Sequence, residues 1–250
     1  MAENQPIRMG RVVSLGRQFN EYAEIYDELF SATMDYEKEV NFCDKILRKN
    51  KCKRILEVGC GTGHRGQFFK SKGYDYVGLD ISEAMLKIAR RKYPEIEFIQ
   101  GDVRKLQLKE KFDAVIFLGK GSVYLTTDDD VMAALKSMKK LIRKGVIIID
   151  GFDAEFIIPN FKKNISWSKK VGDRTIIRQS INTLNPKYPN SWDRKLIYTI
   201  ENNGVEKKYI DDALLRAFSG KELKTFFANA GITDTEIINN DHTVTAIGKV

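Results

Sequence analysis

The chain has 250 residues, of which 42% are hydrophobic and 30% charged, and its formal net charge is +8 at pH 7. These values are typical of a folded, water-soluble protein and exclude a low-complexity chain. No apolar run approaches the roughly 20 residues of a membrane-spanning helix, so no membrane partner is expected. The positive charge has two interpretations: a surface that attracts nucleic acid, or a lysine-rich solvated surface, which the spread of the charges along the chain favours.

The start of the chain and its cysteines indicate the cellular setting. Residues 1–6 lack the basic segment and apolar stretch that mark a signal peptide. Cys43, Cys52 and Cys60 have neither CxxC spacing nor a dense disulfide pattern. A reduced, cytoplasmic setting is therefore expected, without a metal site.

Helical periodicity comes first along the chain, from about residue 19 to residue 47 with a break at 31–33, so two helices are predicted. Apolar strands then alternate with helices four times, and Gly145 is expected to end the last of these helices. The five predicted strands cover residues 54–58, 76–80, 97–102, 112–118 and 146–150. Apolar strands flanked by helices indicate a mainly parallel, two-sided sheet in a doubly wound α/β fold.

The pattern changes after Asp150. Residues 174–184 and 195–200 are predicted to be extended, with a turn at 185–190, which indicates a small antiparallel β-sheet inserted into the α/β fold. A helix at 220–230 and two strands, at 232–238 and 243–250, are predicted to close the chain as a hairpin.

Residues 57–63, with the sequence EVGCGTG, form a glycine-rich turn between the first strand of the α/β pattern and the next helix. Such a turn fits a connection without a ligand, and residues 61–66 also match the GxGxxG pattern of nicotinamide and flavin sites. Acids at three successive strand ends, Glu57, Asp80 and Asp102, favour another ligand. They suit a ribose, an adenine and a cationic tail, and they would repel a pyrophosphate.

These motifs resemble those of the class I SAM-dependent methyltransferases, where SAM is S-adenosylmethionine. The glycine turn resembles motif I of that family, Asp80 its ribose-binding acid, and Asp102 with Val103 its adenine-contacting pair. The resemblance implies a seven-stranded sheet with an antiparallel last strand, SAM as cofactor, and S-adenosylhomocysteine as product. The cofactor-binding residues it implies are Tyr26, Tyr36, Glu57, Gly59, Cys60, Gly61, Gly63, Asp80, Ile81, Met85, Asp102, Val103 and Leu118.

A narrower resemblance is to small-molecule N-methyltransferases that dimethylate amino sugars, with glycine-type N-methyltransferases similar in outline. It rests on Tyr26-Asp27, on residues 35–39 and 121–125, and on the β insertion. It implies that Tyr26 and Tyr36 close over SAM, although both also fit half-buried helix aromatics. The implied domains are a helical lid (1–50), a SAM-binding core (51–150 and 216–250) and a β insertion (151–215) that forms the acceptor pocket or a dimer interface.

The candidate catalytic residues are few. Tyr124 stands where the sugar enzymes have a histidine, which leaves the acceptor open. His242 is predicted to lie in the loop between the last two strands, either solvated or beside the acceptor, and His64 is expected at the start of a helix near the ligand. Trp167 and Trp192 fit either a pocket wall or a core. Because a neutral amine needs no strong base, this scarcity of bases favours an amine acceptor.

Three functions remain open from the sequence. The first is methylation of a small-molecule acceptor by a possible homodimer. The second is methylation of RNA or protein, which the basic charge supports, although residues 118–121 lack the Asn/Asp-Pro-Pro-aromatic signature of base N-methyltransferases. The third is a protein that binds SAM without catalysis, which the intact acids Asp80 and Asp102 disfavour.

Overall fold

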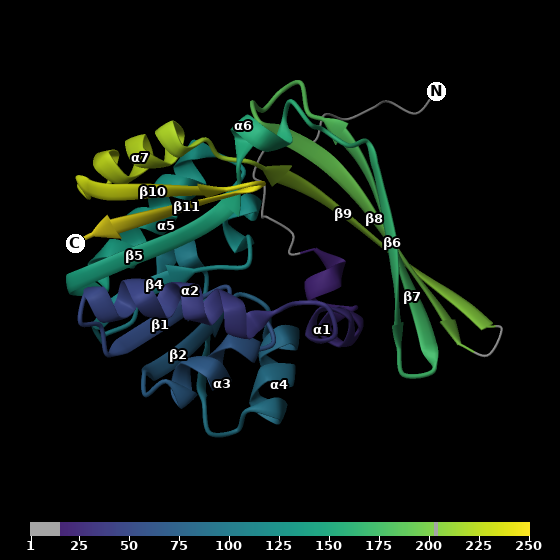
Figure 1. Ribbon diagram of the computed structural model, residues 1–250, viewed down its shortest axis with the longest axis horizontal. Helices are drawn as coiled ribbons and strands as arrows, with labels where there is room; N and C mark the ends of the chain where they lie inside the picture. The colour runs from purple at the N-terminus through teal and green to yellow at the C-terminus, as the bar shows by residue number, and fades with distance from the viewer. Residues whose placement is uncertain (1–15, 203–204) are drawn as a thin grey trace, which may run out of the picture.

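A computed structural model describes residues 16–202 and 205–250, so the segment without a signal-peptide pattern and the first part of the predicted lid lie outside the described residues. Figure 1 shows a twisted sheet covered by helices and, beside it, a second sheet that extends away from this core. Within the described ranges, no helix is both long enough and apolar enough to span a bilayer.

The core sheet has seven strands in the order β10-β11-β5-β4-β1-β2-β3. Neighbouring strands are parallel, except that β11 is antiparallel to both β5 and β10. This confirms the predicted doubly wound sheet with an antiparallel last strand. Its strands are β1 (Arg54–Val58), β2 (Asp75–Asp80), β3 (Glu97–Gln100), β4 (Phe112–Phe117), β5 (Ile142–Phe152), β10 (Asp234–Asn240) and β11 (Thr243–Lys249).

Helices cover both faces of this sheet because its strands alternate apolar side chains to either side. One face packs against α2, α3 and α4, and the other packs against α5 and α7. Side chains at even positions of β1, such as Leu56 and Val58, point to the α5 face, whereas Ile55 points to the α2 face. The helices are α2 (Tyr36–Lys49), α3 (His64–Ser71), α4 (Glu83–Lys92), α5 (Asp128–Lys140) and α7 (Gly220–Asn229).

The insertion is a four-stranded antiparallel sheet in the order β6-β7-β8-β9. The two extended segments predicted there, with the turn between them, are confirmed as β7 and β8. The elements are α6 (Ala154–Ile157), β6 (Asn164–Val171), β7 (Arg174–Leu184), β8 (Ser191–Asn202) and β9 (Val205–Arg216).

Helix α1 (Ala23–Ser31) and the 3-10 turn η1 (Arg17–Phe19) lie between the core and the inserted sheet (Figure 1). Leu29 of α1 is fully buried against Ile176, Leu196 and Tyr198 of that sheet. On its other side α1 contacts α4. The helix therefore touches both parts of the molecule.

The predicted boundary at Gly145 is wrong. Helix α5 ends at Lys140, and β5 starts at Ile142, earlier than predicted, so Gly145 lies inside a strand. The register between β4 and β5 shifts near this point. A Cβ at Gly145 would lie 1.8 Å from the carbonyl oxygen of Asp113, so glycine is needed for close packing of two strands and does not end a helix.

We expect Gly145→Ala to destabilise the protein by about 1–3 kcal/mol, because its methyl group forces β4 and β5 apart. Chemical denaturation measures the free energy of unfolding. Lys144→Ala, at the exposed neighbouring position, is the control and should change it by less than about 0.5 kcal/mol. Equal effects of the two substitutions would contradict this account.

Candidate active site

A cavity of about 730 Å³ lies at the carboxyl ends of the parallel strands, where ligands of such sheets bind. Helix α1, α2 and the inserted sheet complete its wall. Of the predicted site residues, only Glu57 and Gly63 do not line it. Those that do are Tyr26, Tyr36, Gly59, Cys60, Gly61, Asp80, Ile81, Met85, Asp102, Val103, Leu118, Tyr124 and His242.

The glycine turn exposes main chain to this cavity. Gly59, Gly61 and Gly63 have φ values of 68°, 57° and 79°, a backbone region that favours glycine. A Cβ at Gly59 would lie 2.8 Å from the Phe117 ring, whereas a Cβ at Gly61 would meet no atom within 4 Å. Because Gly61 also lines the cavity, its missing side chain leaves room for a ligand against the backbone.

Asp80 ends β2 and is 8% exposed. Its two carboxylate oxygens accept hydrogen bonds from the backbone N–H groups of Gly61 and Ser82, both at 2.8 Å. Burial raises the pKa of Asp80, and these N–H groups oppose that effect. The main chain therefore orients a buried carboxylate at the cavity wall, where it can accept hydrogen bonds from a ligand diol.

Asp102 is less free than predicted. It caps the 3-10 turn η2 (Val103–Lys105), and both of its oxygens accept from the guanidinium of Arg104. Burial would raise the pKa of Asp102, but Arg104 outweighs this effect and holds it below its usual value. Arg104 also lines the cavity and bonds Asp130 at 3.0 Å. The sequence-based prediction missed Arg104, whose only local signal is its position two residues after the acid.

The predictions that Glu57 and Gly63 contact the cofactor are not supported by where the structure places them. Glu57 is fully buried and accepts from Arg65 Nη1 at 3.0 Å and from the Tyr76 hydroxyl at 2.5 Å. It points to the α2 face because side chains alternate along β1. Gly63 directly precedes α3, and a Cβ there would lie 2.7 Å from the Phe98 ring. Both residues support the conformation of the glycine turn from the side that faces away from the cavity.

The two tyrosines expected to cover SAM both line the cavity. The Tyr36 ring stacks on the His64 ring with centroids 4.8 Å apart, and the Arg65 guanidinium lies 5.3 Å from the same Tyr36 ring. Tyr26 packs against the rings of Phe19 and Phe30. Burial raises the pKa of both tyrosines, so both phenols are neutral at physiological pH.

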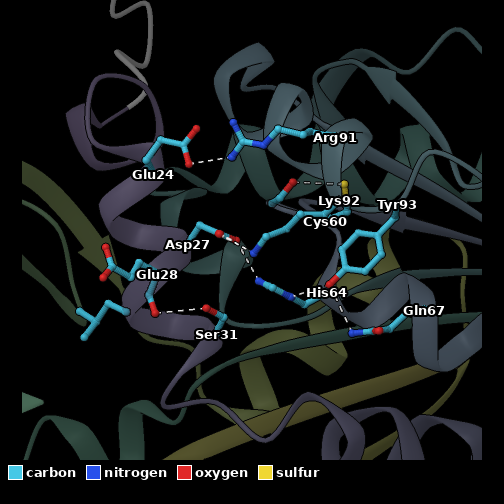
Figure 2. A network of polar contacts seen from close by, with 12 residues as sticks. Glu24, Asp27, Glu28, Ser31, Cys60, His64, Gln67, Arg91, Lys92 and Tyr93 are labelled. Atoms are coloured by element: carbon cyan, nitrogen blue, oxygen red, sulfur yellow. Dashed lines mark hydrogen bonds and ion pairs between the residues drawn. The ribbon is translucent and has the colours of Figure 1, made fainter. Parts of the chain in front are cut away.

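Asp27 ties α1 to the core (Figure 2). Its oxygens bond His64 Nε2 at 2.9 Å and Lys92 Nζ at 2.5 Å, and His64 Nδ1 bonds the Tyr93 hydroxyl at 2.8 Å. Burial alone would raise the pKa of Asp27, but hydrogen bonds from His64, Lys92 and Thr62 lower it to about 2. Both ring nitrogens of His64 are therefore hydrogen-bonded. These bonds hold the imidazole in place against the ring of Tyr36.

The inserted sheet supplies cationic groups at the other end of the cavity. Arg194 is 8% exposed and donates to the Tyr124 hydroxyl at 3.3 Å, while Gln18 donates to the same hydroxyl at 2.9 Å. Arg178 lies 5.8 Å from the centre of the Trp167 ring. The Nε atoms of Arg178 and Arg194 are buried without a hydrogen-bond partner among the described residues. Sequence reasoning missed both arginines.

Comparisons with known proteins agree with this geometry. A family model described as a methyltransferase domain matches residues 55–145. The dTDP-4-amino-2,3,4,6-tetradeoxy-D-glucose N,N-dimethyltransferase of Saccharopolyspora spinosa is 28% identical over 218 residues, which cover 85% of each chain. The crystal structure of DesVI from Streptomyces venezuelae superposes with a TM-score of 0.80 at 25% identity, covering 91% of this chain and 97% of that one.

The comparisons show a SAM-dependent methyltransferase with a Rossmann-like fold of class I. A further solved structure, SAM-bound CalS10, an amino pentose methyltransferase from Micromonospora echinaspora, has the same fold, with a TM-score of 0.73, 21% identity and 99% of each chain covered.

The cavity of the methyltransferase fits SAM. With SAM bound, Asp80 would hold the ribose hydroxyls, the main chain of the glycine turn would lie against the ligand, and Val103 with the Asp102–Arg104 pair would contact the adenine. SAM supplies a methyl group that is already activated on a sulfonium. Neutral aromatic rings and buried carboxylates are compatible with the positive charge of the sulfonium, and for this reason the cavity suits SAM.

We expect Asp80→Ala to weaken SAM binding by about 1.5–3 kcal/mol, which is the scale of a lost charge-assisted hydrogen bond. Isothermal titration calorimetry measures the affinity. Asp75→Ala, at the exposed start of the same strand, is the control and should leave the affinity unchanged. An unchanged affinity in the Asp80 variant would refute the ribose assignment.

Asp27 should stabilise the fold in a pH-dependent way. Its pKa of about 2 lies below the ordinary value of 3.8, so its contribution is complete above pH 4 and is lost as the pH falls toward 2. We expect Asp27→Asn to cost about 1–2 kcal/mol of unfolding free energy at pH 7 and at pH 5, and less below pH 4. Glu24→Gln, which breaks an exposed pair with Arg91, should cost less than about 0.5 kcal/mol. Denaturant titrations that show the same cost for both variants would argue against a stabilising role for the contacts of Asp27 with His64 and Lys92.

Proposed function

We propose that the methyltransferase transfers the methyl group of SAM to an amine nitrogen of a small anionic molecule, such as an amino sugar joined to a nucleoside diphosphate. The observation that carries this proposal is the pair Arg178 and Arg194 at the acceptor end of the cavity. In the described part of the chain, Asp80 and Asp102 are the only carboxylates that line the cavity, and both belong to its cofactor end. Relatives named as methyltransferases of dTDP-linked amino sugars support the same acceptor class.

The charge at the acceptor end also favours the reactive form of an amine. Arg194 is paired with buried Asp211 at 3.5 Å, whereas Arg178 has no carboxylate partner among the described residues. The positive charge of Arg178 disfavours an ammonium ion, and so lowers the pKa of a bound amine. The neutral amine is the nucleophile, and in-line displacement at the sulfonium carbon then needs alignment and exclusion of water more than a strong base.

Tyr124 and His242 have different proposed roles. The Tyr124 oxygen accepts two hydrogen bonds, from Gln18 and Arg194, which leaves its own O–H to donate to an acceptor heteroatom. Tyr124 therefore orients the acceptor and does not act as a base. His242 lines the cavity from the turn between β10 and β11, and no hydrogen bond to its ring is found among the described residues. His242 is our candidate to receive the proton that the amine loses.

The division of labour along the chain is also a proposal. Helices α1 and α2 form a lid through Tyr26 and Tyr36, the core binds SAM, and the insertion receives the acceptor. The outer face of the inserted sheet carries exposed Ile181 and Ile210 and is proposed as a homodimer interface, which sedimentation velocity tests. An RNA or protein acceptor gains no support from the relatives named above.

Methyl transfer to a panel of amines tests the function. The panel contains dTDP-linked amino sugars, the same sugars without the nucleotide, and glycine, and mass spectrometry detects methylated product and S-adenosylhomocysteine. We expect the nucleotide-linked amine to be methylated with the highest kcat/KM. Transfer to a hydroxyl compound but to none of the amines would refute the proposal.

The arginines provide a matched test of the acceptor class. We expect Arg178→Gln and Arg194→Gln to raise KM for the anionic amine by roughly 10-fold or more, through loss of a charge-assisted contact, with unchanged SAM affinity. Lys195→Gln is the control, because Lys195 is exposed on the opposite face of β8. Equal effects of the three substitutions would show that general surface charge, and not this pocket, attracts the acceptor.

A further inference from the structure

Arg65 is a buried cation that the account of the cofactor above does not use. It is 7% exposed, lines the cavity, and is the second residue of α3. Its Nε donates to Glu39 at 2.7 Å and its Nη1 donates to Glu57 at 3.0 Å. A guanidinium has five N–H groups, so these two bonds leave donors, including those of Nη2, for another partner.

The remaining guanidinium nitrogen of Arg65, Nη2, lies beside the carboxyl end of β4. A Cβ at Gly119, which follows β4, would lie 2.3 Å from Arg65 Nη2. Glycine at position 119 therefore leaves this nitrogen the space that a side chain would fill. Gly119 and Tyr36, whose ring lies beside the same guanidinium, also line the cavity.

The order of strands indicates which part of SAM reaches Arg65. Asp80 and Asp102 follow β2 and β3, so they place the ribose and adenine over that half of the sheet. The strands on the other side of β2 are β1 and then β4. The amino-acid tail of SAM must extend in that direction, toward the space between the glycine turn and Gly119.

We propose that Arg65 binds the α-carboxylate of SAM and is a further cofactor-binding residue of this methyltransferase. The arginine is held in place before the ligand arrives, because Glu57 of β1 and Glu39 of α2 grip it from two sides. The Nη2 donors, which neither glutamate occupies, are left for the α-carboxylate of the tail, and the α-ammonium of the tail balances the negative charge of the two glutamates. The tail therefore meets a rigid donor that is already oriented.

Lys120 is the competing cation at this end of the cavity. It lines the cavity, and its Nζ lies 4.0 Å from an oxygen of buried Asp150. Its side chain is 26% exposed, against 8% for Arg65. A flexible and more exposed ammonium orients a carboxylate less well than a fixed guanidinium does. Lys120 is thus the matched comparison.

A comparison of SAM with decarboxylated SAM, which lacks only the α-carboxylate, tests the proposal. Calorimetric titration into the wild-type protein should show at least 10-fold tighter binding of SAM. In Arg65→Gln the two ligands should bind within about 2-fold of each other, because only the affinity for SAM falls, whereas Lys120→Gln should keep the wild-type ratio. If Arg65→Gln does not fold, the double variant Arg65→Met/Glu57→Gln removes both buried charges and should show the same loss of preference.

Two results would overturn the proposal: equal binding of both ligands by the wild-type protein, or an undiminished preference for SAM in the Arg65 variant. These titrations contain no acceptor, so their outcome is independent of the amine panel. Failure to methylate amines would leave the carboxylate assignment standing, and loss of this assignment would leave the acceptor class untouched.

Discussion

The tight turn between β1 and α3 fixes the positions of the groups in this site, and the structure around it depends on that constraint. The N–H of Gly61 orients Asp80, and the residues directly after the turn, His64 and Arg65, bond Asp27 and Glu57. One turn with three glycines at positive φ therefore positions the Asp80 carboxylate, the contact to α1 and a buried cation together. A change in the turn would displace all three, because none of them is held by a flexible surface loop.

The sequence predicted well what depends on local patterns. Hydrophobic periodicity and glycine spacing predicted the succession of strands and helices along the chain. The resemblance to the methyltransferase family implied the antiparallel closing strand and most of the cavity lining. Glu57 shows the limit of such reasoning. An acid near a strand end looks like a ligand-binding group, and only the folded chain shows that it faces away from the cavity, toward Arg65 and Tyr76. Gly145 was misassigned for a similar reason, since its constraint is the Asp113 carbonyl of a neighbouring strand.

The end of the cavity beside the inserted sheet was less predictable because its contacts join distant parts of the chain. Gln18 bonds Tyr124 and Tyr198, and Arg194 bonds Tyr124 from the inserted sheet. Alternation along β7 and β8 predicts that every second residue shares a face, but not which face looks into the cavity. The packing of Leu29 against the inserted sheet determines which face looks into the cavity, and no local sequence motif predicts this packing.

The double attachment of α1 has a consequence for the order of events in turnover. Asp27 and Glu24 hold this helix to the core, whereas Glu28 bonds Arg174 and Leu29 packs into the inserted sheet. Because α1 is attached on both sides, it cannot move away from the core without also weakening its contacts with the inserted sheet. If α1 covers both ligands, as proposed, departure of the spent nucleoside and exchange of the acceptor are a single opening event, and the frequency of that opening sets an upper limit on the turnover rate.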